Sequence, residues 1–161
     1  MSTPDHAPSR SFPGSALLHP LGVGAVALLI VNDHLLKDHW PSWWTGKLSD
    51  LAGLAMFPLV LQGLWEQVGA WNEGSFRSSR TLLVGCVVLT GLCFTAIKVS
   101  ALAGAGWQWG LGVLQWPFNL LHALLTHGRV PPLLPVAHTV DVTDLVTLPA
   151  LLVSLKVGWR R

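Results

Sequence analysis

Apolar residues form four long runs along the chain, at residues 20–36, 51–68, 81–99 and 143–159. Each run is close to, or somewhat below, the ~20 residues that an α-helix needs to cross a ~30 Å hydrocarbon layer. The pattern therefore predicts an all-α integral membrane protein with four transmembrane helices.

A fifth segment, residues 106–125, is long enough to span but contains Pro117 and several polar side chains. On a helix these polar side chains fall within about 60° of one another and leave the rest of the circumference apolar. They are Gln108, Gln115, Asn119, His122 and Thr126. A helix lying flat on a membrane usually has a wider, charged polar face. We therefore expect a re-entrant or tilted interfacial helix on the outer side, with its polar stripe turned toward the other helices.

The start of the chain differs in composition from the rest. Residues 1–15 are rich in Pro and Ser and predict a disordered lead, followed by a single transmembrane domain at residues 16–161. The first apolar run continues into Asn32, Asp33 and His34 without a small-residue cleavage site. It therefore predicts a retained helix and not a signal peptide.

Composition supports the membrane interpretation. Hydrophobic residues make up 51% of the chain and charged residues 11%, against about 25% charged in soluble domains. The net charge of +2 and the scattered basic residues argue against nucleic acid as a partner. Cys86 and Cys93 lie in one apolar run without metal-ligand spacing, so we expect them to be small core residues.

Basic residues near the span ends divide unequally between the two sides. One side has Arg10, Arg77, Arg80, Lys156, Arg160 and Arg161, and the other has Lys37, Lys47, Lys98 and Arg129. Cytoplasmic loops carry the excess of Lys and Arg. This asymmetry predicts a protein of the bacterial inner (cytoplasmic) membrane with both termini in the cytoplasm.

Ionisable side chains gather near the helix ends that this topology places outside. The candidate site residues are Asp33, His34, Lys47, Asp50, Lys98, Asp141 and Asp144. The last helix would be only about 25 Å long at 1.5 Å per residue, so its acidic start should be recessed. Ionisable groups at such depth are costly unless paired, and they usually have a function. We expect Lys98 to pair with Asp50 or Asp144 in a pocket that binds a polar or lipid headgroup.

Simpler interpretations stay open for the same charges. Asp50 and Asp144 each follow a hydroxyl residue, and a carboxylate at a helix start contributes ~0.3 to 1 kcal/mol through the helix dipole. Lys98 would then extend its ammonium to the headgroups without a partner. The histidines show no recognised metal spacing, and no GxSxG elbow is present. The sequence thus favours binding over catalysis and assigns no catalytic residue, metal or cofactor.

Residues 49–54, SDLAGL, match residues 143–148, TDLVTL, in their Asp, their two Leu and their hydroxyl position. If the match reflects a parallel two-helix repeat, each half is a helix, an outer loop and a second helix that begins with the acidic motif. The halves would then be related by an axis normal to the membrane.

Four segments carry a family resemblance: HPLGVGAVALLIVNDHLLK, TGKLSDLAGLAMFP, TAIKVS and VDVTDLVTLPALL, together about a third of the chain. They resemble a family of small bacterial polytopic membrane proteins that has no assigned activity. More distantly, residues 46–48 and 141–145 resemble the VanZ-like membrane proteins, which are linked to glycopeptide resistance and the cell envelope. The chain departs from the VanZ-like pattern at Ser49-Asp50, at Lys98 and at Ser100.

Three functions fit these features. The first is an envelope-related protein whose outer pocket binds a polar or lipid headgroup. The second is an accessory structural subunit of a larger membrane complex, whose small residues let neighbouring helices approach closely. Those small residues are Gly104, Ala105, Gly106, Gly110 and Gly112. The third is a proton or ion conductor, which we rank last because a conductor would more often place its acids within the helices.

The orientation can be tested with single cysteines in a background where Cys86 and Cys93 are replaced by Ala. We expect an impermeant maleimide to label Ser42→Cys in intact cells and to leave Ser78→Cys unlabelled, because the two residues lie on opposite sides. The reverse pattern would contradict the predicted topology.

Overall fold

The computed structural model describes residues 12–40, 42–73 and 79–159, and all regular elements in this part of the chain are helices. Four of them are long and apolar enough to cross a membrane: Pro20–His39, Trp43–Asn72, Arg80–Val99 and Val142–Trp159. The predicted all-α membrane protein with four spanning helices is confirmed. Several residues used in the orientation argument lie outside the described residues: Arg10, Arg77, Ser78, Arg160 and Arg161.

The chain divides into two compact units. Unit 1 comprises the residues up to Gly91 and those from Thr147 onward, and unit 2 comprises Leu92–Val146.

The first helix of unit 1 runs on beyond its predicted end. α1 (Pro20–Val31) continues through a π-helical turn, η2 (Asn32–Leu36), into α2 (Lys37–His39). Pro20 occupies the first helical position, where its missing N–H costs nothing, and the His19 side chain accepts the N–H of Leu21 at 3.2 Å.

The second helix, α3 (Trp43–Glu73), is 31 residues long. It packs against α1, η2, the short 3-10 helix η1 (Ser15–Leu18) and the last helix, α6 (Leu151–Trp159). It begins at Trp43, so the prediction that it opens at Ser49-Asp50 is wrong. Ser42 and Thr45 form the start instead: the N–H of Ser42 donates to Thr45 Oγ1 at 3.3 Å, and that hydroxyl donates to the carbonyl of Ser42 at 2.7 Å. These bonds at the first turn let the helix start nearly two turns earlier than predicted.

Pro58 lies inside α3, and the turn before it makes a polar contact with α6 (Leu151–Trp159). Because proline has no N–H, the carbonyl of Leu54 loses its partner within the helix. The hydroxyl of Ser154, which is fully buried, lies 3.2 Å from that carbonyl and 2.8 Å from the carbonyl of Ala55. α6 thus brings one hydroxyl proton to the two carbonyls in the turn before the proline, and the carbonyl of Ala55 is the nearer of the two.

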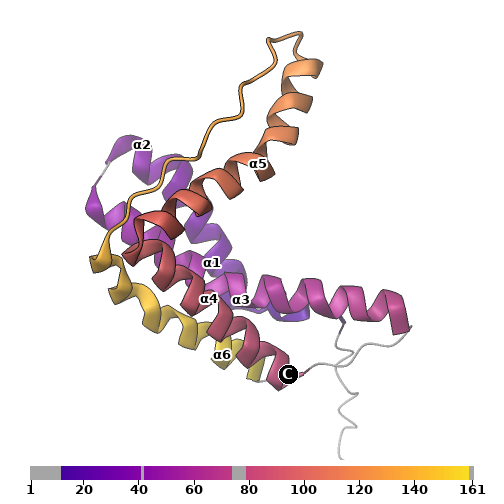
Figure 1. The fold of residues 1–161 in the computed structure, drawn as a ribbon. Helices are drawn as coiled ribbons and strands as arrows, with labels where there is room; N and C mark the ends of the chain where they lie inside the picture. Colours follow the sequence, from indigo (N-terminus) through magenta and orange to yellow (C-terminus); the bar gives the residue numbers. More distant parts are fainter. Residues whose placement is uncertain (1–11, 41, 74–78, 160–161) are drawn as a thin grey trace, which may run out of the picture. The chain divides into compact units, whose positions relative to one another are not determined.

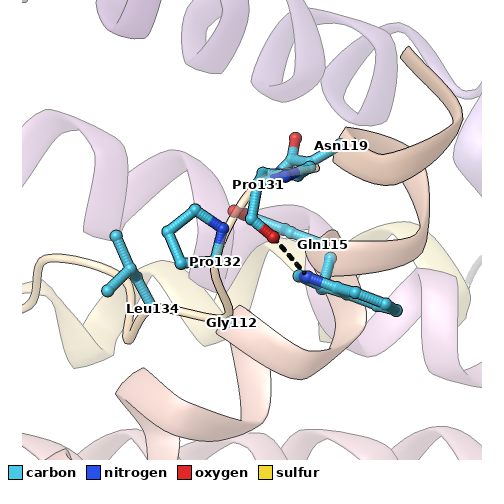
Figure 2. A pocket seen from close by; sticks show the side chains of 7 residues that line it. Gly112, Gln115, Asn119, Pro131, Pro132 and Leu134 are labelled. Carbon is cyan, nitrogen blue, oxygen red and sulfur yellow. Dashed lines mark hydrogen bonds between the residues drawn. The ribbon is translucent and has the colours of Figure 1, made fainter. Parts of the chain in front are cut away.

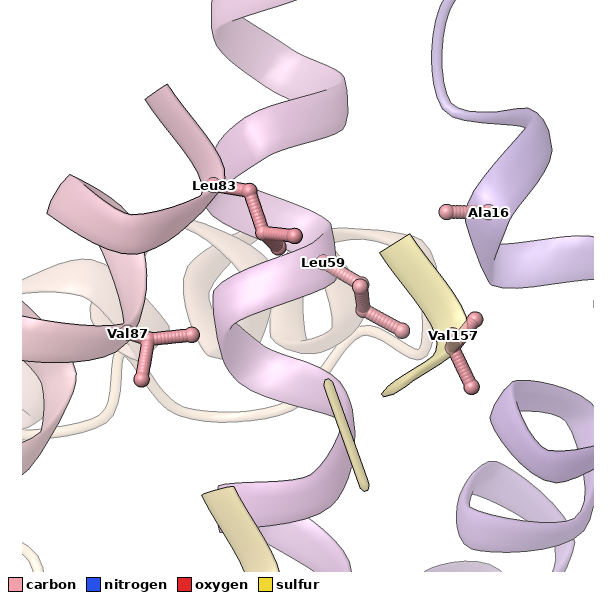
Figure 3. Close-up of a cluster of buried hydrophobic side chains, with 5 residues drawn as sticks. All are labelled: Ala16, Leu59, Leu83, Val87 and Val157. Atoms are coloured by element: carbon pink, nitrogen blue, oxygen red, sulfur yellow. The ribbon is translucent and has the colours of Figure 1, made fainter. Parts of the chain in front are cut away.

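The core of unit 1 is a small apolar cluster (Figure 3), made of Ala16, Leu59, Leu83, Val87 and Val157. Gly158 allows the last helix to reach this cluster, since a Cβ there would lie 2.5 Å from Cδ2 of Leu83. Cys86 is buried beside it, as expected of a small core residue, whereas Cys93 of unit 2 is exposed. The prediction of a core position for Cys93 is wrong.

Part of the expected N-terminal lead packs on α3. Residues 1–11 lie outside the described residues, but Ser15–Leu18 form a short 3-10 helix, η1, that contacts α3. Gly14 precedes it with a φ of 75°, a conformation that favours glycine. Its Cα faces Gly63, where a Cβ would approach to 3.0 Å.

Unit 2 contains the end of α4 (Arg80–Val99), α5 (Ala101–Leu125), an extended segment at residues 128–141 and the start of η3 (Val142–Ala150). Ser100 separates the first two helices and caps α5, because its hydroxyl accepts the N–H of Ala103 at 3.3 Å. α5 ends with His127 at a φ of 53° and a bond from the N–H of Gly128 to the carbonyl of Ala123 at 2.8 Å. That bond is the Schellman arrangement.

The extended segment returns along α5 (Figure 1). The N–H of Val136 donates to the carbonyl of Gln108 at 3.0 Å, and the Gln108 side chain donates to the carbonyl of His138 at 2.9 Å. α5 itself is not among the four helices apolar enough to span. Its polar stripe was expected to face other helices. That expectation is wrong for Gln108, Gln115 and Asn119, which lie beside this non-helical segment, and for His122, which is exposed.

The last span starts as a 3-10 helix, η3, before α6. Its cap is Asp141, not Thr143 as predicted, because Asp141 Oδ1 accepts both the N–H of Thr143 at 2.9 Å and its hydroxyl at 2.8 Å. Asp144 thus lies in the first turn, whereas Asp50 lies well inside α3. The two acidic motifs do not occupy equivalent positions, so the predicted repeat, in which each motif begins a helix, is wrong in this respect.

Ser154→Ala should lower the free energy of unfolding by about 1 kcal/mol, the net value of a buried hydrogen bond. The loss should be smaller in a Pro58→Ala background, where residue 58 regains an N–H for the carbonyl of Leu54. Thermal or denaturant unfolding in a mild detergent measures both losses as a double-mutant cycle. Equal losses in the two backgrounds would contradict this role of Ser154.

Candidate functional site

A buried amide organises the point where the first two helices of unit 1 meet. Asn32 begins the π-helical turn and is fully buried. Its Nδ2 donates to the carbonyl of Thr45 and to the hydroxyl of Ser49, each at 2.7 Å. We call Asn32, Asp33, Lys37, Thr45 and Ser49 the α1–α3 corner.

The carboxylate of Asp33 lies at the open edge of this corner. Its Oδ1 accepts the hydroxyl of Ser49 at 2.6 Å and lies 2.7 Å from Nζ of Lys37. The Asp33 and Lys37 side chains are 39% and 41% exposed, so both charges are accessible. The π-helical turn holds Asp33 on the face toward Ser49, and such turns occur frequently at functional sites.

Aromatic and basic residues follow at the start of α3. Trp43 and Trp44 are stacked at 4.1 Å between ring centroids, and Nζ of Lys47 lies 5.3 Å from the centroid of Trp43. Both tryptophans are more than 60% exposed. Exposed Trp and a neighbouring Lys are typical of the headgroup level of a membrane.

A second charged group lies in unit 2, where Nζ of Lys98 is 2.6 Å from Oδ2 of Asp144. Only 8% and 12% of the two side chains are exposed, and the ammonium also lies 5.4 Å from the centroid of Phe94. The predicted ion pair of Lys98 with a helix-start carboxylate is present, so Lys98 does not simply extend to the headgroups. Burial makes this pair a structural link, because breaking it would leave an uncompensated charge.

The seven predicted site residues thus fall in two units. In unit 1, Asp33 belongs to the α1–α3 corner, His34 is exposed, Lys47 lies over Trp43 and Asp50 is half-buried. In unit 2, Asp144 pairs with Lys98 and Asp141 caps the last span. The sequence therefore identified two kinds of charged residue. Lys98, Asp141 and Asp144 have structural roles, and Asp33 is accessible.

Sequence reasoning missed several uncharged partners and one acid. Asn32 and Ser49 were not included as site residues, although they fix the Asp33 carboxylate. Glu66 lies inside α3 and is only 4% exposed. Its carboxylate accepts hydrogen bonds from Nε2 of Gln62 at 2.9 Å and from the N–H of Gly14 at 3.1 Å. Its four-residue spacing from Gln62, inside an apolar run, is the signal that could have identified it.

The chemistry of the α1–α3 corner is that of binding. Its accessible groups are one carboxylate and one ammonium, with an amide and two hydroxyls behind them. In the described part of the chain, no group of three or more His, Cys, Asp or Glu side chains could hold a metal ion. The corner has the donors and acceptors to hold a small polar group of mixed charge.

Comparison of the chain with protein-family models, with curated proteins and with solved structures found no match.

Lys98→Met should lower the free energy of unfolding by about 3–5 kcal/mol, because it leaves Asp144 buried without its partner. The double variant Lys98→Met with Asp144→Asn should recover part of that loss. Unfolding in mild detergent and expression level are the measurements. Lys156→Met, at an exposed lysine, is the control and should change stability little. A Lys98→Met protein as stable as wild type would contradict the proposed role of the pair.

Proposed function

We propose that this membrane protein binds the zwitterionic headgroup of a lipid at the α1–α3 corner. Asp33 receives the ammonium of the headgroup and Lys37 its phosphate. The wider setting is the outer face of the bacterial inner membrane, with both termini cytoplasmic, in an envelope-related role.

The hydrogen bonding of the Asp33 carboxylate is the observation that carries the proposal. All of its hydrogen bonds and its ion pair use Oδ1, and Oδ2 makes none with the described residues. One oxygen is thus held by the protein and the other is free to accept a donor. A primary ammonium donates hydrogen bonds, and a hydrogen bond to a charged group is roughly twice as strong as a neutral one.

The amide behind the carboxylate adds a second unfilled acceptor. Oδ1 of Asn32 is buried and has no hydrogen-bond partner within the described part of the chain. A buried unpaired oxygen costs about 1–3 kcal/mol, so a donor that enters the corner would be bound with a gain. Both unfilled groups are acceptors, which favours a donor-rich ammonium over a choline group.

The surroundings fit a lipid ligand better than a soluble one. Trp40, Trp43 and Trp44 are all exposed close to the corner in sequence, and Trp at this density marks the membrane–water interface. Lys37 and Lys47 provide cations for the phosphate. A phosphoethanolamine headgroup carries an ammonium for Asp33 and a phosphate for the lysines, and two carbons separate the two groups.

The alternative function, an accessory subunit of a larger membrane complex, draws on the small residues of α5. Gly104 and Gly112 are covered by the extended segment, whereas no described atom lies within 4 Å of a Cβ built at Gly106 or Gly110. These two glycines leave a surface where another helix could approach closely. Purification in mild detergent distinguishes the alternatives, because a subunit should co-purify with larger proteins in fixed stoichiometry.

We expect the protein in nanodiscs to retain phosphatidylethanolamine about tenfold better than phosphatidylcholine, which has no ammonium N–H to donate. Native mass spectrometry of the released complexes measures this preference. Asp33→Asn should abolish it and Lys37→Gln should weaken retention of both lipids, because each removes one charge of the corner.

Asp38→Asn is the matched control, since Asp38 is an exposed carboxylate one turn away in α2. It should leave the preference unchanged. Equal retention of the two lipids by the wild type, or an equal effect of the two Asp variants, would overturn the proposed function.

A further inference from the structure

A recess of about 200 Å³ lies between α5 and the extended segment of unit 2 (Figure 2). α5 contributes Gly112, Gln115, Trp116 and Asn119, and the segment contributes Pro131, Pro132 and Leu134. None of these side chains ionises, so the recess differs in chemistry from the charged α1–α3 corner of unit 1.

Two close contacts fix the walls of the recess. The indole N–H of Trp116 donates to the carbonyl of Pro131 at 2.9 Å, as the dashed line in Figure 2 shows. At Gly112, a Cβ would collide with the carbonyl oxygen of Leu134, so only glycine lets the segment lie this close. The prolines also restrict the backbone of the segment.

The free hydrogen-bonding capacity of the recess belongs to two amides. Pro131 and Pro132 have no N–H, and the N–H of Trp116 is already used. Gln115 and Asn119 are four residues apart on α5, hence on one face, and neither makes a hydrogen bond with the described residues. Each amide offers two donors and one acceptor oxygen.

Both amides are exposed at the edge of the recess, with His122 as the next exposed polar residue along the same stripe, and large apolar side chains flank them on α5. Leu114, Phe118 and Leu121 are 64%, 71% and 55% exposed. In an apolar environment an unpaired amide costs free energy, which a ligand with matching groups would recover. A ligand with both donors and acceptors and no charge meets all the conditions of the recess.

We propose that this recess binds an uncharged, hydroxyl-rich group of the size of one sugar ring, with Gln115 and Asn119 as its hydrogen-bonding residues. The volume corresponds to six or seven waters at about 30 Å³ each, enough for a single ring. Hydroxyls both donate and accept, as the amides do. The sugar reaches the site either on a glycolipid or free in solution.

The test uses the full chain in phosphatidylcholine nanodiscs, prepared without sugar detergents. The probes are monoglucosyl diacylglycerol, diacylglycerol without the sugar, phosphatidylglycerol, and free methyl glucoside. Native mass spectrometry measures lipid retention and equilibrium dialysis measures the free sugar. The variant Gln115→Leu/Asn119→Leu keeps side-chain size and removes the amides, and Asn72→Leu changes an exposed amide of unit 1 as the control.

We expect the wild type and Asn72→Leu to bind a glucosyl probe, and the double variant to bind it about tenfold more weakly, equivalent to about 1.4 kcal/mol. If the double variant loses binding of monoglucosyl diacylglycerol but not of methyl glucoside, the natural ligand is a glycolipid. If it loses binding of methyl glucoside, the natural ligand is a sugar free in solution. Asp33→Asn should change neither glycolipid retention nor methyl glucoside binding. The sugar proposal can therefore fail while the headgroup proposal for the α1–α3 corner holds, and the reverse.

Equal binding of diacylglycerol with and without the sugar would overturn the proposal. So would a preference for phosphatidylglycerol, or unchanged sugar binding by a double variant whose melting temperature equals that of the wild type.

Discussion

A helix in lipid must satisfy its own backbone polar groups, and α3 does not do so alone, because Pro58 removes one N–H from its interior. The replacement comes from Ser154, a hundred residues later in the chain. This donor fixes where the last helix packs, and the close approach of Gly158 to Leu83 follows from the same placement. In unit 1 the hydroxyl of Ser154 and the apolar cluster around Leu59 and Leu83 together hold α6 against α3.

The same requirement accounts for the bonds of the Asn32 amide nitrogen and for the pair of Lys98 with Asp144. Asn32 joins two helices because its amide must find acceptors away from water, and it finds them on α3. Lys98 and Asp144 are tolerated at low exposure because each neutralises the other. In each case a polar side chain connects elements that lie far apart in sequence, and it does so through a bond that lipid could not provide.

Polar groups whose hydrogen-bonding capacity is not used up are then informative about function. Oδ2 of Asp33 accepts no hydrogen bond from the described residues, whereas Oδ1 of the same carboxylate accepts the hydroxyl of Ser49 and pairs with Lys37. The amides of Gln115 and Asn119 are unfilled in a recess without charge. The two places differ in charge, so the ligands proposed for them differ: a zwitterionic headgroup at one and a hydroxyl-rich group at the other.

The sequence by itself determined the four apolar spans and the all-helical class, because length and hydropathy are properties of each segment alone. It also identified Lys98 as a residue that needs an acidic partner. The start of α3 at Trp43 was missed although the bonds between Ser42 and Thr45 are local, because the apolar run by which the helix was recognised begins only at residue 51. The sequence could not place Gln108 against an extended segment, or find Asn32 and Ser49 beside Asp33, because hydrogen bonds between distant residues exist only once the elements have packed.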